Sequence, residues 1–134
     1  MKNKFGIIIS VVIALLLQGC YDREIDESKP GTPISPVTNL NHAIDGNNVI
    51  LTWELPAQFP DDIIIPVSIS IKIYVDNVLK SSPVVADGPV TYTYTTYDPA
   101  KSYIFVVKVV GTVDTDDPNV SKTRYSPGEY IIID

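Results

Sequence analysis

Apolar and polar residues alternate with a period of two through much of residues 37–133, which is the pattern of β-strands that bury one face. Residues 67–75 show the clearest alternation. Their odd-numbered positions are all Val or Ile and are expected to face a core, whereas Ser68, Ser70, Lys72 and Tyr74 are expected to face solvent. Seven strands are predicted in this way, at residues 37–44, 49–54, 67–75, 78–80, 90–95, 103–111 and 129–133.

Residues 103–111 differ from the other predicted strands because they are apolar on both faces. The odd-numbered residues 103–109 fall on one face, and the even-numbered residues 104–110, which include Lys108, fall on the other. Such a strand is typical of the centre of a sheet, where both faces are covered or partly covered. We therefore expect the other strands to be arranged around it.

Short turn signals separate the strands. Asp45-Gly46 and Asp76-Asn77 are typical of tight hairpin turns, and Pro99 after Asp98 fixes a corner before residue 103. Residues 55–66 and 114–118 are expected to be loops. Strand-favouring Val, Ile, Thr and Tyr dominate between these turns, so the pattern favours an all-β fold.

Two of these stretches resemble fibronectin type III domains. Tyr97 and Pro99, followed by Tyr103-x-Phe105-x-Val107, are similar to the E–F corner and strand F of that family, and Val49-x-Leu51-x-Trp53 before Pro56 is similar to its strand B. Tyr97 stands where the family usually has Leu, and Ala100 where it often has Gly. The resemblance covers residues 36–134 and implies a seven-stranded antiparallel β-sandwich with Trp53, Pro99 and Tyr103 as structural residues.

The resemblance also implies specific contacts and a topology. In that family the strand F tyrosine, here Tyr103, forms a tyrosine corner in which its hydroxyl bonds to upstream backbone. The start of the sandwich would lie at the same end as the B–C and F–G loops. The A–B, C–C′ and E–F turns and the C-terminus would lie at the other end.

The first residues are typical of a targeting segment. Lys2 and Lys4 precede an apolar run at residues 5–17, which is long enough for a signal peptide and short for a membrane span. Leu17-Gln-Gly-Cys20 resembles a bacterial lipobox, so Cys20 is the expected lipidation site and the membrane the expected partner; the alternative is an uncleaved signal anchor. The predicted organisation is a signal peptide at 1–19, a lipidated acidic and Pro-rich linker at 20–36 and the sandwich at 37–134.

Charge narrows the partners further. Removal of residues 1–19 leaves eight basic and sixteen acidic residues, a net charge of about −8. Such a chain disfavours nucleic acid. The acidic stretch at residues 21–28 resembles the export signal of surface lipoproteins in Bacteroides-like bacteria, so the outer membrane and the cell surface are the expected location; a periplasm-facing lipoprotein is the alternative.

Candidate catalytic chemistry is sparse. Cys20 and His42 are the single cysteine and histidine, so neither a zinc cluster nor a triad has its ligands or partners. There is no glycine-rich phosphate loop. The sequence therefore predicts a protein that is not an enzyme and that carries no cofactor.

One acidic loop offers oxygen ligands for calcium. Asp114, Asp116 and Asp117 lie within a few residues of Asn119, and the pair at 61–62 would join them at the same end of the sandwich. The Gly and the distant Glu of a complete calcium loop are missing. An ordinary solvated turn is the favoured interpretation, and these three Asp residues remain the metal candidates.

Phe59, Tyr74 and Tyr125 are the candidate binding residues, because exposed aromatic side chains stack on sugars or anchor a protein partner. The alternative is that they cover an end of the core. We expect a lipid-anchored envelope module for protein–protein interaction or adhesion. Glycan binding beside a polysaccharide-uptake system and a structural role in an envelope assembly are the alternatives. Aromatic rings along one sheet face would favour glycan, and an uncovered apolar edge strand would favour addition of a partner strand.

Overall fold

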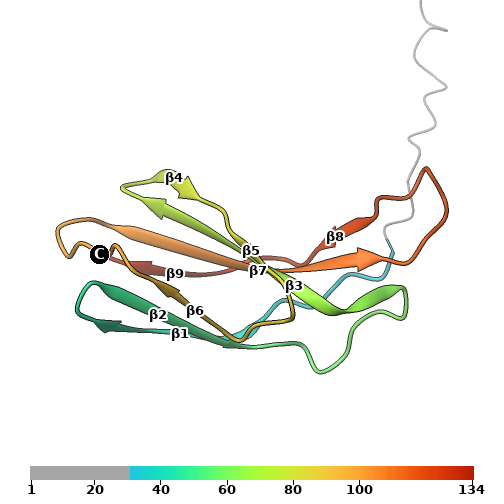
Figure 1. Cartoon of the computed structure of the whole chain (residues 1–134), viewed down its shortest axis with the longest axis horizontal. Helices are drawn as coiled ribbons and strands as arrows, with labels where there is room; N and C mark the ends of the chain where they lie inside the picture. The colour runs from blue at the N-terminus through green and yellow to red at the C-terminus, as the bar shows by residue number, and fades with distance from the viewer. Residues whose placement is uncertain (1–30) are drawn as a thin grey trace, which may run out of the picture. The chain divides into compact units, whose positions relative to one another are not determined.

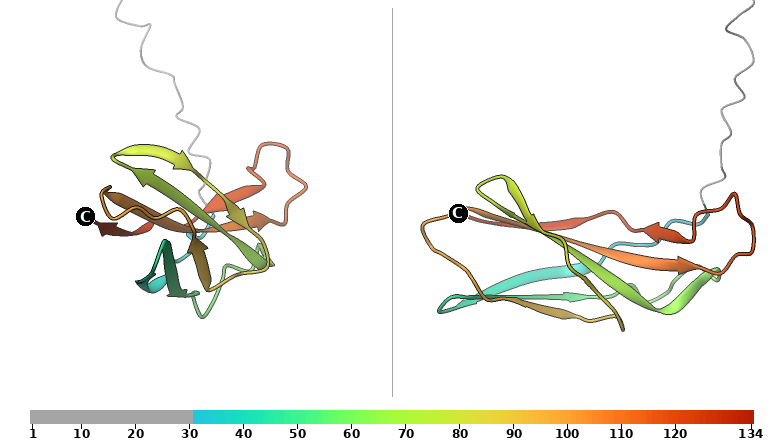
Figure 2. Two further views of the ribbon diagram at one scale, coloured as in Figure 1. Left: turned by 60° about the vertical axis from the view of Figure 1, so that its left-hand side comes forward. Right: turned by 45° about the horizontal axis from the view of Figure 1, so that its top comes forward.

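The computed structural model describes residues 31–134, which form two antiparallel sheets packed face to face (Figures 1 and 2). The smaller sheet has the order β1-β2-β6, with β1 at Thr38–Asp45, β2 at Asn48–Glu54 and β6 at Thr91–Tyr94. The larger sheet has the order β4-β3-β7-β8, and β5 and β9 pair with β3 and β7 respectively. Its strands are β3 (Ile63–Val75), β4 (Val78–Ser81), β5 (Val84–Val85), β7 (Tyr103–Val113), β8 (Thr123–Tyr125) and β9 (Glu129–Ile133).

This arrangement confirms the predicted all-β antiparallel sandwich. The strand order places A, B and E in one sheet and C′, C, F and G in the other, as in a fibronectin type III domain. All seven predicted strands are present, and two short strands, β5 and β8, were not predicted. The predicted position of the strand apolar on both faces is also correct, because β7 lies between β3 and the pair β8 and β9.

Two details of β3 were predicted wrongly. The strand begins at Ile63 and not after Pro66, because Ile63 lies opposite Val113 and both are buried. A register shift between Ile64 and Ser68 accommodates the proline, which has no N–H to donate. Ser70 is buried and not solvent-facing, since Val84 of β5 and Lys108 of β7 lie directly opposite it on either side.

The core follows the alternation of the central strands. The odd-numbered residues of β3 from Val67 to Val75 and those of β7 from Tyr103 to Val109 are buried. From the smaller sheet, Val49, Leu51 and Trp53 are buried against them, so Trp53 and Tyr103 share one interior. The Trp53 indole Nε1–H donates to the carbonyl of Pro89 at 2.9 Å, which satisfies its one polar group.

The corner before β7 is closed by hydrogen bonds. The backbone N–H of Asp98 donates to the Tyr103 hydroxyl at 2.9 Å, which is the contact of a tyrosine corner. The Asp98 carboxylate accepts from the N–H of Ala100 at 2.9 Å, and Pro99 lies exposed between them. The Tyr103 ring lies within 5.7 Å of Tyr94 and 5.2 Å of Tyr97, measured between ring centroids. The corner is thus tied to both the backbone and the aromatic end of the core.

No helix long and apolar enough to cross a membrane occurs within residues 31–134. Cys20, the signal peptide and most of the predicted linker lie outside the described residues.

The hydroxyl of Tyr103 is expected to stabilise the fold. Tyr103→Phe keeps the ring contacts and leaves the Asp98 N–H without its acceptor, so the free energy of unfolding should fall by about 1–2 kcal/mol. Chemical denaturation measures the loss. Tyr130→Phe, which removes a hydroxyl from an exposed ring, is the matched control and should change stability little. Equal effects of the two substitutions would contradict a stabilising role for the corner.

Candidate functional site

The outward-facing side of the larger sheet gathers apolar and aromatic side chains. Residues directly opposite each other in an antiparallel pair share one face. Tyr74 of β3, Ile104 of β7 and Ile132 of β9 are aligned across three strands, and Leu79 of β4 lies opposite Tyr74. Lys72, Val106 and Tyr130 form the next row. Further along β7, Val110 lies opposite Tyr125 of β8.

These residues all align with even-numbered positions of β7, whose odd-numbered positions are buried in the core. They therefore lie on the opposite side of the sheet from the core. We call this side the outer face and define it by Lys72, Tyr74, Leu79, Ile104, Val106, Lys108, Val110, Tyr125, Tyr130 and Ile132.

Much of the outer face is open to solvent. The exposed fractions are 65% for Tyr130, 58% for Tyr125 and 52% for Ile132. Tyr74 and the even-numbered residues of β7 from Ile104 to Val110 are half-buried among their neighbours. Three tyrosines, two of which are candidates from the sequence, thus share one sheet face with aliphatic side chains between them.

The charge on the outer face has one sign. Lys72 and Lys108 lie on it, while the strands of the larger sheet contain a single acidic residue, Glu129, which is aligned with the buried Val107. The full sequence has a net charge of −6. The outer face is therefore an apolar and cationic region on an acidic chain.

The outward side of the smaller sheet is different. Its aligned rows consist of Ala43, Ile50 and Thr93, and of Asn41, Thr52 and Thr91. Apart from Ile50, these side chains are small or polar, and they include no aromatic ring. Within residues 31–134, the outer face of the larger sheet is thus the better candidate for a binding surface.

Phe59 does not belong to the candidate surface. It is half-buried and packs against the core, so for Phe59 the alternative to a binding role, covering an end of the core, is the one that the structure has. The apolar ring gains more from covering the end of the sandwich than from facing water. His42 lies exposed on β1 opposite Leu51, with no catalytic partner bonded to it in the described chain.

The acidic loop does not assemble a metal site. Asp114 donates its backbone N–H to the carbonyl of Asp62 at 2.8 Å, and the Asp117 carboxylate accepts from the N–H and the side-chain amide of Asn119. Among residues 31–134, no three His, Cys, Asp or Glu side chains are grouped as ligands for a metal ion. The three candidates Asp114, Asp116 and Asp117 therefore lie near one another without converging.

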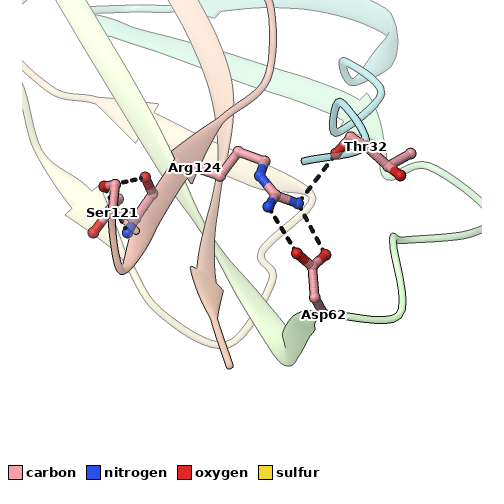
Figure 3. Close-up of polar contacts among 5 residues, drawn as sticks. Thr32, Asp62, Ser121 and Arg124 are labelled. Carbon is pink, nitrogen blue, oxygen red and sulfur yellow. Dashed lines mark hydrogen bonds and ion pairs between the residues drawn. The ribbon is translucent and has the colours of Figure 1, made fainter. Parts of the chain in front are cut away.

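Asp62 is instead engaged by Arg124 (Figure 3). The guanidinium donates to both carboxylate oxygens, at 2.9 and 2.7 Å, and to the carbonyl of Thr32 at 3.1 Å. Such bidentate pairs are the strongest form of this contact. Thr32 thus lies beside the B–C and F–G loops, at the end of the sandwich that the topology predicted. Figure 3 also shows Ser121, whose hydroxyl is bonded to Thr123 in the same F–G region.

This pair shifts the pKa values of both partners. The hydrogen bonds from Arg124 hold the pKa of Asp62 below its ordinary value of 3.8, and the same bonds raise the pKa of Arg124. Arg124 is the more enclosed partner, with a side chain 16% exposed against 42% for Asp62. The pair is a structural clamp that joins β8 to the B–C loop and to Thr32.

Sequence reasoning missed Tyr130, Ile132 and Arg124. Tyr130 and Ile132 occur in a predicted strand, and their alternation with Ile131 and Ile133 was a usable signal. Their alignment with Lys72 and Tyr74 depends on the order of strands in the sheet, which the local pattern does not contain. Arg124 joins residues 92 and 62 positions away, and nothing in its neighbourhood in the sequence predicts either contact.

Comparisons with known proteins agree with this fold. A family model described as "Domain of unknown function (DUF4945)" matches residues 20–133. No curated protein matches the sequence. A solved structure described as "Myokine structure" has a TM-score of 0.50 at 14% identity and covers 76% of this chain and 96% of that one. At that identity the likeness concerns the fold only.

Two further solved structures are similar over part of their length. The central fibronectin-III array of RIM-binding protein has a TM-score of 0.48 at 21% identity, covering 75% of this chain and 35% of that one. The spore cortex lytic enzyme SleM of Clostridium perfringens has a TM-score of 0.47 at 18% identity, covering 77% of this chain and 29% of that one. This chain therefore spans about a third of each of those proteins.

The clamp between Asp62 and Arg124 predicts a pH-dependent stability. Because the pKa of Asp62 is lowered on folding, its contribution is present above 3.8 and is lost as the pH falls below that value through the folded pKa. The unfolding free energy of the wild type should exceed that of Asp62→Asn at pH 5–7, and this difference should shrink below about pH 3.8. Urea denaturation at a series of pH values measures it.

Asp116→Asn, which changes an exposed carboxylate in the F–G loop, is the matched control. It should show no such pH-dependent difference from the wild type. A constant difference between the wild type and Asp62→Asn from pH 7 to pH 3 would contradict the clamp.

Proposed function

Since the chain belongs to the family described as "Domain of unknown function (DUF4945)", we propose from the geometry of its larger sheet that it is a non-enzymatic binding module. The outer face docks a protein partner. The observation that carries this proposal is the set of aliphatic side chains, among them the exposed Leu79 and Ile132, that shares one face of one sheet with three tyrosines.

The composition of the outer face favours a protein as the partner. Interface centres are rich in aromatic and aliphatic side chains and poor in acidic ones. Ile104, Val106, Val110 and Ile132 fill the space between the tyrosines, and their side chains have nothing to donate to or accept from a hydroxylated sugar. An apolar surface of this kind fits another apolar protein surface.

The two lysines narrow the partner's chemistry. Lys72 and Lys108 lie within the outer face, and no carboxylate of the neighbouring strands aligns with them. Carboxylates on the partner would complement them and would steer the encounter. We therefore propose a partner surface that is apolar at its centre and carries acidic residues opposite these lysines.

The proposal retains the membrane attachment predicted from the sequence. Lipidation at Cys20 would hold the sandwich at the outer membrane of a bacterial envelope, with the cell surface as the proposed location. An accessory or adhesion role between envelope components, or with a host surface, fits this placement.

Glycan binding is the second candidate, and the three tyrosines favour it. Tyr74, Tyr125 and Tyr130 share one face, and aromatic rings stack on sugar rings. A glycan ligand would suit an accessory lipoprotein of a polysaccharide-uptake system. Retention of a protein or of a polysaccharide separates the two candidates.

Charge reversal on the outer face tests the proposal. The double substitution Lys72→Glu with Lys108→Glu should lower retention of the partner protein from native envelope extracts about tenfold or more, because acidic groups would then face acidic groups. The matched control is Lys101→Glu with Lys122→Glu, which changes the net charge equally at exposed sites outside the outer face. Quantitative mass spectrometry of the captured proteins is the measurement.

The control variant should retain the same proteins as the wild type. Equal losses in both double variants, or no protein retained better by the wild type than by the Lys72 and Lys108 variant, would contradict a protein-binding outer face. Retention of purified polysaccharides with no specific protein would replace it with the glycan candidate.

A further inference from the structure

Strand β9 forms an unpaired edge of the larger sheet, and β1 of the smaller sheet lies near it. It pairs with β7 through five aligned residues, and within residues 31–134 no strand pairs with its other side. Tyr130 and Ile132 are its most exposed apolar residues. An edge of this kind presents backbone N–H and C=O groups that can pair with another strand.

The direction of these backbone groups follows from hydrogen bonds along β7. The carbonyl of Val109 accepts from the N–H of Ser126 and its N–H donates to the Ser126 hydroxyl, while the N–H of Val113 donates to the carbonyl of Lys122. Odd-numbered residues of β7 thus direct their backbone groups toward β8 and β9. On the other side, the carbonyl of Ser102 accepts from the N–H of Asp76, which follows β3.

In an antiparallel ladder, the residues opposite these odd positions are the ones bonded to β7. They are Glu129, Ile131 and Ile133. The N–H and C=O groups of Tyr130 and Ile132 therefore point away from β7, toward the open edge. The two residues that expose their side chains also expose their backbone.

Two of the other sheet edges are interrupted, and β6, the remaining edge of the smaller sheet, has only four residues. Strand β1 has a register shift between Thr38 and Asn41, with Asn39 at a positive φ of 52°. Strand β4 pairs with β3 through a second irregularity, between Ile73 and Tyr74, and Pro83 follows it before β5. Bulges and prolines are the devices that keep edge strands from pairing. Strand β9 contains neither.

We propose that β9 pairs with β9 of a second copy of this chain, which joins the two larger sheets into one. The pairing is centred on Ile131, which lies opposite Ile131 of the second copy. Tyr130 of each copy then lies opposite Ile132 of the other. The free N–H and C=O groups of both residues are then bonded in both copies. This register pairs the whole of β9.

The placement of charge selects a second copy as the occupant. In this register Glu129 lies opposite Ile133 and Asp134 lies opposite Gly128, so no acidic residue faces another across the pair. Side chains at positions 129 and 134 also point to opposite faces of the sheet. The edge therefore meets its own copy without like-charge contacts and with matching apolar residues, as a two-fold interface requires. The paired strand is short, which makes the interface small, so pairing is expected where copies are crowded.

Disulfide trapping in intact cells that express the full chain tests this inference. In the proposed register Ile131 is the only residue of β9 that lies opposite the same residue of the second copy. The two Cα atoms are then close enough for a disulfide to bridge positions 131 of the two copies. Ile131→Cys should give an oxidant-dependent dimer band several times stronger than that of the wild-type chain. The wild-type chain is the control for cross-links through Cys20, its single cysteine. Tyr130→Cys should not, because its copies would lie more than about 7 Å apart.

Two further substitutions test the edge itself in the Ile131→Cys chain. Ile132→Pro removes an N–H that points away from β7, and Ile132→Lys places a charge on the edge, so each should abolish the band while leaving the thermal unfolding transition in place. Thr52→Cys, on the smaller sheet, should give no band.

A band from Ile131→Cys no stronger than that from Thr52→Cys would overturn the inference. So would a band that persists with Ile132→Lys, or a cross-link to a different protein in place of a dimer. Tyr130 and Ile132 also belong to the outer face. The two tests remain distinguishable, because this one measures a cross-link between two copies of the chain, whereas the Lys72 and Lys108 variant measures retention of a partner protein.

Discussion

The structure depends on β7 being hydrogen-bonded on both sides. Its odd-numbered residues direct their side chains to the core and their backbone groups to β8 and β9; its even-numbered residues direct side chains to the outer face and backbone groups to β3. One strand therefore fixes the core, the outer face and the register of both neighbours. The Tyr103 hydroxyl fixes where this strand begins, because it accepts the N–H of Asp98.

The local sequence pattern was sufficient to predict strands and their faces wherever buried and exposed residues alternate. The inward residues of β3 were predicted from a period of two, and so was the division of β7 into two faces, since a one-residue slip would move the whole apolar set to solvent. The corner was predicted from Tyr97, Pro99 and Tyr103. Elements without enough burial of their own were missed: β5 has two residues and β8 three, and each exists because a longer neighbour offers it backbone partners.

The outer face could be predicted only in part. Tyr74 and Tyr125 were candidates from the sequence, but their membership of one face depends on pairings with Ile104 and Val110. Long-range pairing also brings Arg124 to Asp62. Its guanidinium binds the Asp62 carboxylate, which the sequence analysis had considered as a further metal ligand. Phe59 turned inward because a loop residue can still reach the core. The larger sheet has both features that the sequence analysis used to distinguish ligands. Aromatic rings share one face, as expected for glycan, and an apolar edge strand lies beside them, as expected for addition of a partner strand.

The central role of β7 is open to one direct measurement, native-state amide hydrogen exchange followed by NMR. Odd and even amides of Tyr103–Val113 are bonded to different neighbours, so both sets should exchange only when the whole domain unfolds. The edge strand β1 should exchange faster. Exchange of the β7 amides as fast as that of the β1 amides would contradict the account.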